Sequence, residues 1–423
     1  MILIALLSLA CLISHLVSQR NPATPGVAHA AIWLLVSLGY LLFLDESSLI
    51  STKTSLVLLI GITAFSVGIA VGSRLNGLDL TSREPNVLRL PVPMLIALVS
   101  AIGLIMMMTK AFQYATVHFY SFDDLDLPVG QARSWFGGHG SWYDGLRAHL
   151  NAHQGGSFGA ASYILNFSFA GTAYLILYVR RLQATPWLVP SIALSLGFAI
   201  LSTGRTYLVL LGCIVIAAAM PASRRQRLAL ALAAPLVGGF LLVLATLMSG
   251  RLDITSVDSL LASLGQSNLK RYALTAVGAL DILVSSDLPA TGGSMTFRTP
   301  IAILRFLGVP VNVPELLQPN VTFSGFVVNI YTVFSPYYRD FGLAGVGLFM
   351  AILGGLHGWV FQQLKTGLPI FVVANAILFY ALLMQFIHDQ YFSLMSQWIQ
   401  ILAWTYLFNK LQLLPSIREQ DRR

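Results

Sequence analysis

The chain has 423 residues, of which 56% are hydrophobic and only 10% are charged, and its formal net charge is +8. A soluble domain usually carries about 25% charged residues, so this composition excludes a protein that is surrounded mainly by water. It indicates an all-α polytopic integral membrane protein. A spanning helix needs about 20 mostly apolar residues, and the chain has the length for roughly ten of them.

Eleven apolar runs, bounded by charged residues or by Pro and Gly, follow one another along the chain. They predict about eleven transmembrane helices in one transmembrane domain, residues 1–423. The first run lacks a preceding basic segment and a following cleavage site of small residues, so we expect a retained helix. The predicted spans are residues 2–17, 27–44, 55–73, 92–112, 159–179, 186–203, 206–220, 228–249, 341–364, 367–387 and 391–409.

Basic residues are concentrated in alternate loops, and this predicts the orientation of the helices. The odd-numbered loops and the C-terminal tail together carry fourteen basic and four acidic residues. Lys and Arg are retained on the cytoplasmic side, so we expect the N-terminus outside and the C-terminus inside. Membrane insertion therefore accounts for the positive net charge. We expect membrane lipids as partners and no nucleic acid.

Two segments on the predicted outer side are too long to be simple connections. They are residues 113–158 and 250–338, and both are rich in aromatic and aliphatic residues. The runs LKRYALTAVGALDILV and FRTPIAILRFLG in the second loop predict short amphipathic helices. The first loop contains four His and four Asp residues, but their spacing matches no zinc signature. We therefore expect no metal, and no cofactor, because Walker and dinucleotide-binding patterns are also missing from the sequence.

Charged residues avoid the middle of the predicted spans, which distinguishes an enzyme from an ion-coupled transporter. A transporter accepts the cost of ionisable groups inside the membrane in order to build a relay. The polar residues predicted at mid-span are better explained as hydrogen-bonding partners between helices. They are His15, His29, His357, Asn166, Asn375 and Gln385.

The basic residues on the predicted outer side are mainly arginines, whose planar donors bind phosphate through two parallel hydrogen bonds. For most of them, anchoring to lipid headgroups is the simpler explanation. Arg205 differs because it lies in LSTGRTYLVLL, a very short turn between two apolar helices, where a free helix N-terminus can also bind an anion. We expect Arg205 to bind substrate.

The segment NIYTVFSPYYRDFGLAGVG, residues 329–347, leads from the second long loop back into the membrane. An aromatic belt with an Arg–Asp pair at the interface is one explanation. A site for sugar and phosphate is the other, because such a site needs hydrogen-bonding aromatics beside a cation. The candidate residues are Tyr337, Tyr338, Arg339 and Asp340.

The motif HDQY, residues 388–391, lies in a predicted outer turn between the last two spans. His388 and Asp389 could supply a general base. The alternative is a turn whose His and Asp are simply solvated.

Several of these motifs resemble the Wzy-type O-antigen and oligosaccharide repeat-unit polymerases. They are NPATPGVAHAAIWLLVSLGYLLF, STKTSLVLLIGITAFSVGIAVG, STGRTYLVLL and, above all, NIYTVFSPYYRDFGLAGVGLFMAILGG. The resemblance implies transfer of a growing glycan from undecaprenyl pyrophosphate to a lipid-linked repeat unit at the periplasmic face of the bacterial inner membrane. It also implies functional arginines in two large periplasmic loops, for which Arg133 in the first loop and Arg271 and Arg298 in the second are candidates. A chain-length regulator is a candidate partner. Members of the family commonly have more than eleven spans.

On this interpretation, Arg205 and Arg339 stabilise the pyrophosphate, and the catalytic base is Asp340 or, as second choice, His388. Two other functions stay open. An O-antigen ligase uses the same donor with a different acceptor. A flippase or exporter of lipid-linked sugars is not an enzyme, and we expect it to line its cavity with charge.

Overall fold

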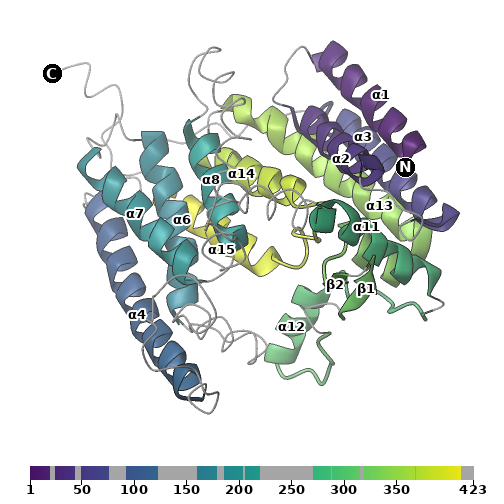
Figure 1. Cartoon of the computed structure of the whole chain (residues 1–423). Helices are drawn as coiled ribbons and strands as arrows, with labels where there is room; N and C mark the ends of the chain where they lie inside the picture. Colours follow the sequence, from purple (N-terminus) through teal and green to yellow (C-terminus); the bar gives the residue numbers. More distant parts are fainter. Residues whose placement is uncertain are drawn as a thin grey trace, which may run out of the picture. The chain divides into compact units, whose positions relative to one another are not determined.

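The computed structural model describes twelve stretches of the chain and is mainly helical (Figure 1). It divides into two units: unit 1 comprises residues 1–79, 261–371 and 377–398, and unit 2 comprises residues 80–260, 372–376 and 399–423. The described residues are 1–19, 24–42, 49–75, 92–121, 160–178, 185–202, 205–219, 270–286, 288–314, 319–324, 326–366 and 368–410.

The helices of each unit come from distant parts of the sequence. Unit 1 contains α1 (Ile2–Gln19), α2 (Pro25–Leu42), α3 (Thr52–Gly72), α11 (Lys270–Ser285), α12 (Arg298–Phe306), α13 (Phe334–Gln363) and the 3-10 turn η3 (Leu364–Thr366). Unit 2 contains α4 (Val92–Ser121), α6 (Ala160–Tyr178), α7 (Thr185–Leu201) and α8 (Arg205–Ala219). Residues of α14 (Pro369–Leu383) and α15 (Met395–Lys410) are divided between the two units.

Four helices in the described part of the chain are long and apolar enough to cross a membrane, and the chain is accordingly a membrane protein. They cover Pro25–Leu42, Thr52–Gly72, Val92–Gln113 and Phe334–Thr366. The predicted spans 2–17, 159–179, 186–203, 206–220 and 367–387 coincide with shorter apolar helices, and the span 391–409 coincides with α15, which has 16 residues. The predicted span 228–249 lies outside the described residues. The helical fold class is thus confirmed, while the number of eleven spans stays a prediction.

Helix boundaries differ from the prediction at three places. Helix α4 continues to Ser121 and so extends into the predicted loop 113–158. Helix α13 begins at Phe334, ahead of the predicted start, and bends at Gly342, whose φ of 64° is a conformation that glycine adopts without strain. Between α14 and α15, the non-helical segment 384–394 is longer than the predicted HDQY turn.

The two predicted amphipathic runs of the second loop are helices, α11 and α12. A short hairpin, which the sequence analysis did not predict, follows them: β1 (Val321–Phe323) pairs antiparallel with β2 (Phe326–Val328). Phe323 packs closely on α11 at Gly278, where a side chain larger than hydrogen would collide with its ring. Asp281 of α11 accepts hydrogen bonds from the Ser51 backbone N–H (2.8 Å) and hydroxyl (2.7 Å), which fixes α11 beside the start of α3.

Helices α3 and α13 make the closest helix contact of unit 1, because glycines bring their backbones together. A Cβ atom at Gly68 would collide with the Ala351 carbonyl oxygen, and one at Gly354 with that of Phe65. Small residues permit this approach, which is a common way to pack helices in membranes, where lipid tails are as apolar as the side chains. The contact also reaches the start of α13, where the Phe334 ring lies against Gly61.

Candidate functional site

The Asp340 carboxylate ties the start of α13 to the segment just before α12. Its Oδ2 accepts a hydrogen bond from the Thr296 backbone N–H (2.6 Å), and its Oδ1 accepts from the Met295 N–H (3.3 Å) and the Thr291 hydroxyl. The residue is only 3% exposed. A buried carboxylate that satisfies backbone donors stabilises local structure. This geometry therefore favours a structural role for Asp340 over its predicted role as a base.

Arg339, the neighbour of Asp340, has a different environment. Its buried Nε has no hydrogen-bond partner in the described part of the chain, and its carbonyl oxygen accepts from the Thr291 N–H (3.2 Å). Tyr331 lies near its side chain: burial raises the pKa of Tyr331, and the positive charge of Arg339 opposes this rise. A guanidinium without a protein acceptor is the group expected to bind an anion such as phosphate.

Tyr337 links the start of α13 to segment 384–394. Its hydroxyl donates a hydrogen bond to Oδ1 of Asp389 (2.9 Å), and its ring stacks on Phe349, with 5.1 Å between the ring centroids. The Val333 N–H donates to the Gln385 carbonyl oxygen (2.8 Å) in the same region. Tyr338 is partly exposed. The structure therefore brings two of the predicted motifs together, and Tyr337 is the residue that connects them.

Asp389 organises the chain that follows it. Its Oδ1 accepts from the Tyr391 N–H (3.0 Å), and its Oδ2 accepts from the N–H groups of Phe392 and Ser393 (both 3.3 Å). Burial raises the pKa of Asp389 to about 6, although these hydrogen bonds oppose the rise. The carboxylate is 2% exposed. The prediction of a solvated turn is thus wrong for Asp389, because this segment folds inward around the carboxylate.

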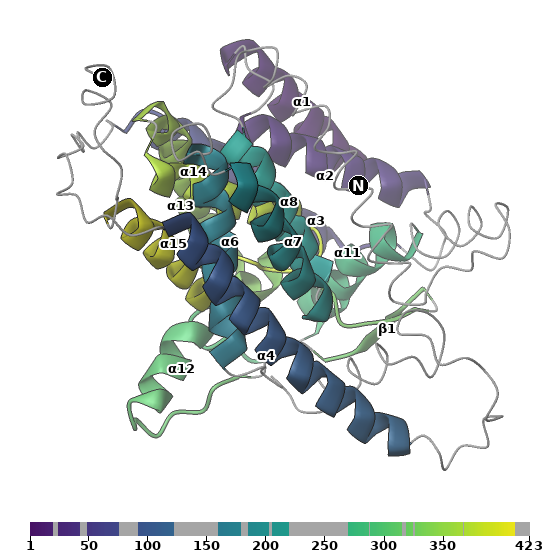
Figure 2. The ribbon, with the colours of Figure 1, turned by 90° about the vertical axis from the view of Figure 1, so that its left-hand side faces the viewer.

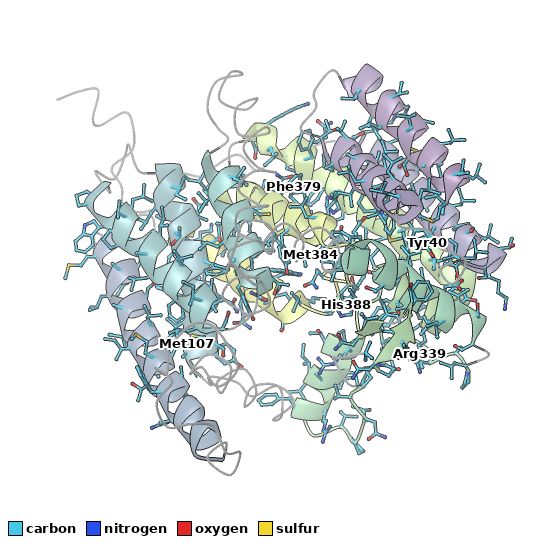
Figure 3. All side chains as sticks on the ribbon, viewed as in Figure 1. Tyr40, Met107, Arg339, Phe379, Met384 and His388 are labelled. Atoms are coloured by element: carbon cyan, nitrogen blue, oxygen red, sulfur yellow. The ribbon has the colours of Figure 1, made fainter. Side chains whose placement is uncertain are left out.

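His388 precedes this turn and keeps a nitrogen atom free. Its Nδ1 is buried without a hydrogen-bond partner in the described residues, although the side chain as a whole is partly exposed. Burial lowers the pKa of His388 to about 4, so the imidazole is neutral near pH 7. An anion bound close to it would raise this pKa. His388 and Arg339 both belong to unit 1 (Figure 3).

A chain of buried hydrogen bonds holds segment 384–394 against α2 and α13. Oε1 of Gln385 lies 2.9 Å from Nδ1 of His29 and accepts from Nε1 of Trp33 (3.2 Å). Its Nε2 donates to the Tyr391 hydroxyl (3.0 Å), which also lies 2.9 Å from Nε2 of His357. His29, His357 and Gln385 therefore form hydrogen bonds between helices and the segment, as predicted.

The same prediction holds in unit 2 for Asn166, whose Nδ2 donates to Oε1 of Gln400 (2.9 Å). Buried polar groups of a non-helical segment need hydrogen-bond partners. The hydrogen-bonded chain around Gln385 meets this requirement for segment 384–394.

The structure describes the other predicted arginines only in part. Nε of Arg298 donates to the Pro314 carbonyl oxygen (2.8 Å), so part of its guanidinium supports the loop after α12. Arg205 is the first residue of α8, which confirms the predicted helix start, while residues 203 and 204 of the predicted turn lie outside the described residues. Arg271 belongs to α11. The side chains of Arg205 and Arg271, and the whole of Arg133, lie outside the described residues.

Within the residues that the structure describes, no group of three or more His, Cys, Asp or Glu side chains is arranged to hold a metal ion. The first long loop, with most of its histidines and aspartates, lies beyond Ser121 and outside this description. The expectation of a metal-independent protein therefore stays a prediction.

Two features of the site were missed by the sequence analysis. The first is the set of donors to Asp340 in residues 291–296; the pair Gly292–Gly293 signals a turn there, with φ values of 59° and 92°, but not its partner. The second is the bond between Tyr337 and Asp389, which are 52 residues apart.

Comparisons of the chain with protein-family models, with curated proteins and with solved structures find no match in any of the three.

Proposed function

We propose that this chain is a membrane glycosyltransferase that polymerises undecaprenyl-pyrophosphate-linked oligosaccharide repeat units into O-antigen or a related surface polysaccharide. It would act at the periplasmic face of the bacterial inner membrane. Two kinds of observation support the proposal: the resemblance of residues 329–347 to the repeat-unit polymerases, and the chemistry of the site that these residues form.

The observation that carries the proposal is Nε of Arg339, which is buried without a hydrogen-bond partner in the described part of the chain. An Arg–Asp pair at an interface would neutralise itself, but Asp340 bonds to residues 291–296. The positive charge of Arg339 is left for an anion at the point where α13 begins. A pyrophosphate leaving group gains negative charge as the glycosidic bond breaks, so a fixed cation there accelerates the reaction.

His388 is the better candidate for the base that deprotonates the acceptor hydroxyl. Nδ1 of its imidazole has no hydrogen-bond partner in the described residues, whereas both oxygens of Asp340 already accept hydrogen bonds. Asp389 and Tyr337 hold the segment that carries His388 and so act as positioning residues. Arg205, at the start of α8 in unit 2, stays a separate candidate for binding an anion, because its helix N-terminus adds free N–H groups.

The test is the glycan profile of a strain that lacks the gene and carries variants at matched membrane levels. We expect Arg339→Ala to leave single repeat units in place of long chains, with a rate loss on the order of a hundred- to thousand-fold, as for a deleted oxyanion donor. Lys365→Ala is the control, because Lys365 is exposed in η3 beyond the opposite end of α13. It should keep the full ladder.

Two outcomes would overturn the proposal. Normal chain length in Arg339→Ala would remove Arg339 from the site. Loss of every repeat unit from the lipid A core, single units included, would indicate a ligase instead. Arg339→Lys sharpens the result, since lysine keeps the charge but loses the two parallel hydrogen bonds of arginine. Activity in the lysine variant that is close to wild type would indicate anchoring to headgroups.

A further inference from the structure

The end of α12 and the turn that follows it expose an unusual amount of apolar surface. Phe306 is 89% exposed and Leu307 is 69% exposed, and Ile303, Leu304 and Val309 are exposed as well. Arg305 lies among them and is also exposed. Side chains of this kind are seldom left together in water, and a contiguous group of them marks a surface that something covers.

This exposed tip is fixed to the start of a membrane-crossing helix. Asp340 of α13 accepts hydrogen bonds from Met295 and Thr296, directly ahead of α12. Phe297, which precedes α12, lies 6.4 Å from Phe341 of α13 between ring centroids. The tip is therefore held near the end at which α13 enters the membrane. Within unit 1, α12 lies apart from α1, α2 and α3 in both ribbon views (Figures 1 and 2).

The apolar surface continues from α12 onto the side of α13. Phe297 and Phe341 are both partly exposed and touch edge to face. Further along α13, Leu348 and Ile352 are also exposed. In a helix that crosses a membrane, such residues face lipid. The tip of α12 thus extends the exposed apolar surface of a helix that is long and apolar enough to cross a membrane, and this continuity identifies lipid as the material that covers the tip.

We propose that the end of α12 and the turn after it, residues 303–310, insert into the lipid leaflet at the end where α13 begins. Phe306 and Leu307 enter the boundary between headgroups and acyl chains, at a depth of about 5–10 Å, as in other interfacial helices. The aliphatic part of Arg305 lies along this apolar layer while its guanidinium reaches the lipid phosphates. The inference is independent of the proposed enzymatic function.

The test measures the depth of a spin label in the full-length protein. Cys11 and Cys213 are first replaced (Cys11→Ala, Cys213→Ala), and a nitroxide is attached in the variants Phe306→Cys and Leu307→Cys. The protein is placed in nanodiscs of phosphatidylethanolamine and phosphatidylglycerol. Collision rates are recorded with oxygen, which concentrates in lipid, and with a water-soluble nickel chelate. The matched control is Thr322→Cys, at an exposed position of β1.

We expect labels at positions 306 and 307 to collide with oxygen several-fold more often than with the nickel chelate, and the label at position 322 to show the reverse. A high nickel collision rate at 306 and 307 would place the tip in water and overturn the proposal. Low rates with both reagents would also overturn it, because they would mean that a second copy or another protein covers the tip. Because Phe306 and Leu307 are so exposed, the substitutions themselves should leave folding unchanged.

Discussion

Unit 1 holds its interior together in two contrasting ways, and both involve α13. Where α13 crosses α3, glycines let the two backbones touch and no polar side chain is needed. Where α13 meets segment 384–394, the chain is not helical, and Tyr337 and His357 bond to groups of that segment. The first contact depends on shape alone, whereas the second depends on chemistry. The region that could perform a reaction is the second one.

The largest loss of stability is expected from removal of the Asp389 carboxylate, which accepts several hydrogen bonds. Asp389→Ala removes the acceptor for the Tyr337 hydroxyl and for three backbone N–H groups. Each buried donor left without a partner costs about 1–3 kcal/mol, so we expect the amount of folded protein to fall sharply. Size-exclusion chromatography of a fluorescent fusion measures this loss. A wild-type amount of Asp389→Ala, with unchanged thermal stability, would show that water replaces the carboxylate and that the segment is not closed.

The close contact of α3 and α13 can be tested with two adjacent glycines, Gly354 and Gly355, of which the second is the control. Gly354→Ala places a methyl group against the Phe65 carbonyl oxygen, while Gly355→Ala places one at an ordinary 3.7 Å from the Gly68 carbonyl oxygen. Overpacking costs about 1–3 kcal/mol, and alanine favours a helix over glycine by about 1 kcal/mol. We expect a lower melting temperature for Gly354→Ala and an equal or higher one for Gly355→Ala. Equal behaviour of the two variants would refute the close contact of α3 and α13.

A smaller effect is expected from the hydrogen-bonded chain around Gln385. Gln385→Leu removes the partner of His29, Trp33 and Tyr391. Hydrogen bonds between membrane helices average about 0.6 kcal/mol each, so the loss should be about 1–2 kcal/mol. Asn166→Leu, which removes one bond in unit 2, should lose less. Melting of both variants in the same detergent tests the order, and an equal or greater loss for Asn166→Leu would contradict it.

The sequence predicts the apolar helices of this structure well and the hydrogen-bonded segment 384–394 poorly. Apolar length is a local property, so it identified α2, α3, α4 and α13 as long apolar helices without knowledge of their partners. The extent of segment 384–394 depends on bonds such as that from Gln385 to His29, which are 356 residues apart. No local pattern contains that information.

The candidate site divides in the same manner. Arg339 and His388 could be selected from residue type and position, because a cation at a membrane entry and a histidine in a turn are visible in the sequence. The role of Asp340 could not. Its carboxylate bonds to Thr291 and Thr296, and only the fold shows that these donors leave Arg339 without its neighbour as a partner.

The smallest effect is expected in the pH dependence of stability, to which Asp389 and His388 contribute with opposite sign. Burial raises the pKa of Asp389 to about 6 in the folded chain. As the pH falls through 6, the buried carboxylate becomes protonated, the cost of burying its charge is removed, and the folded chain becomes more stable. Burial lowers the pKa of His388 to about 4 in the folded chain. As the pH falls from 7 to 5, this histidine therefore gains a proton in the unfolded chain but not in the folded one, and stability decreases. The two contributions oppose each other in the wild type. Asp389→Asn keeps only the second, and its melting temperature should therefore fall more steeply between pH 7 and pH 5 than that of the wild type. Parallel melting curves over that range would mean that Asp389 titrates alike in the folded and unfolded chains, as a solvated carboxylate would.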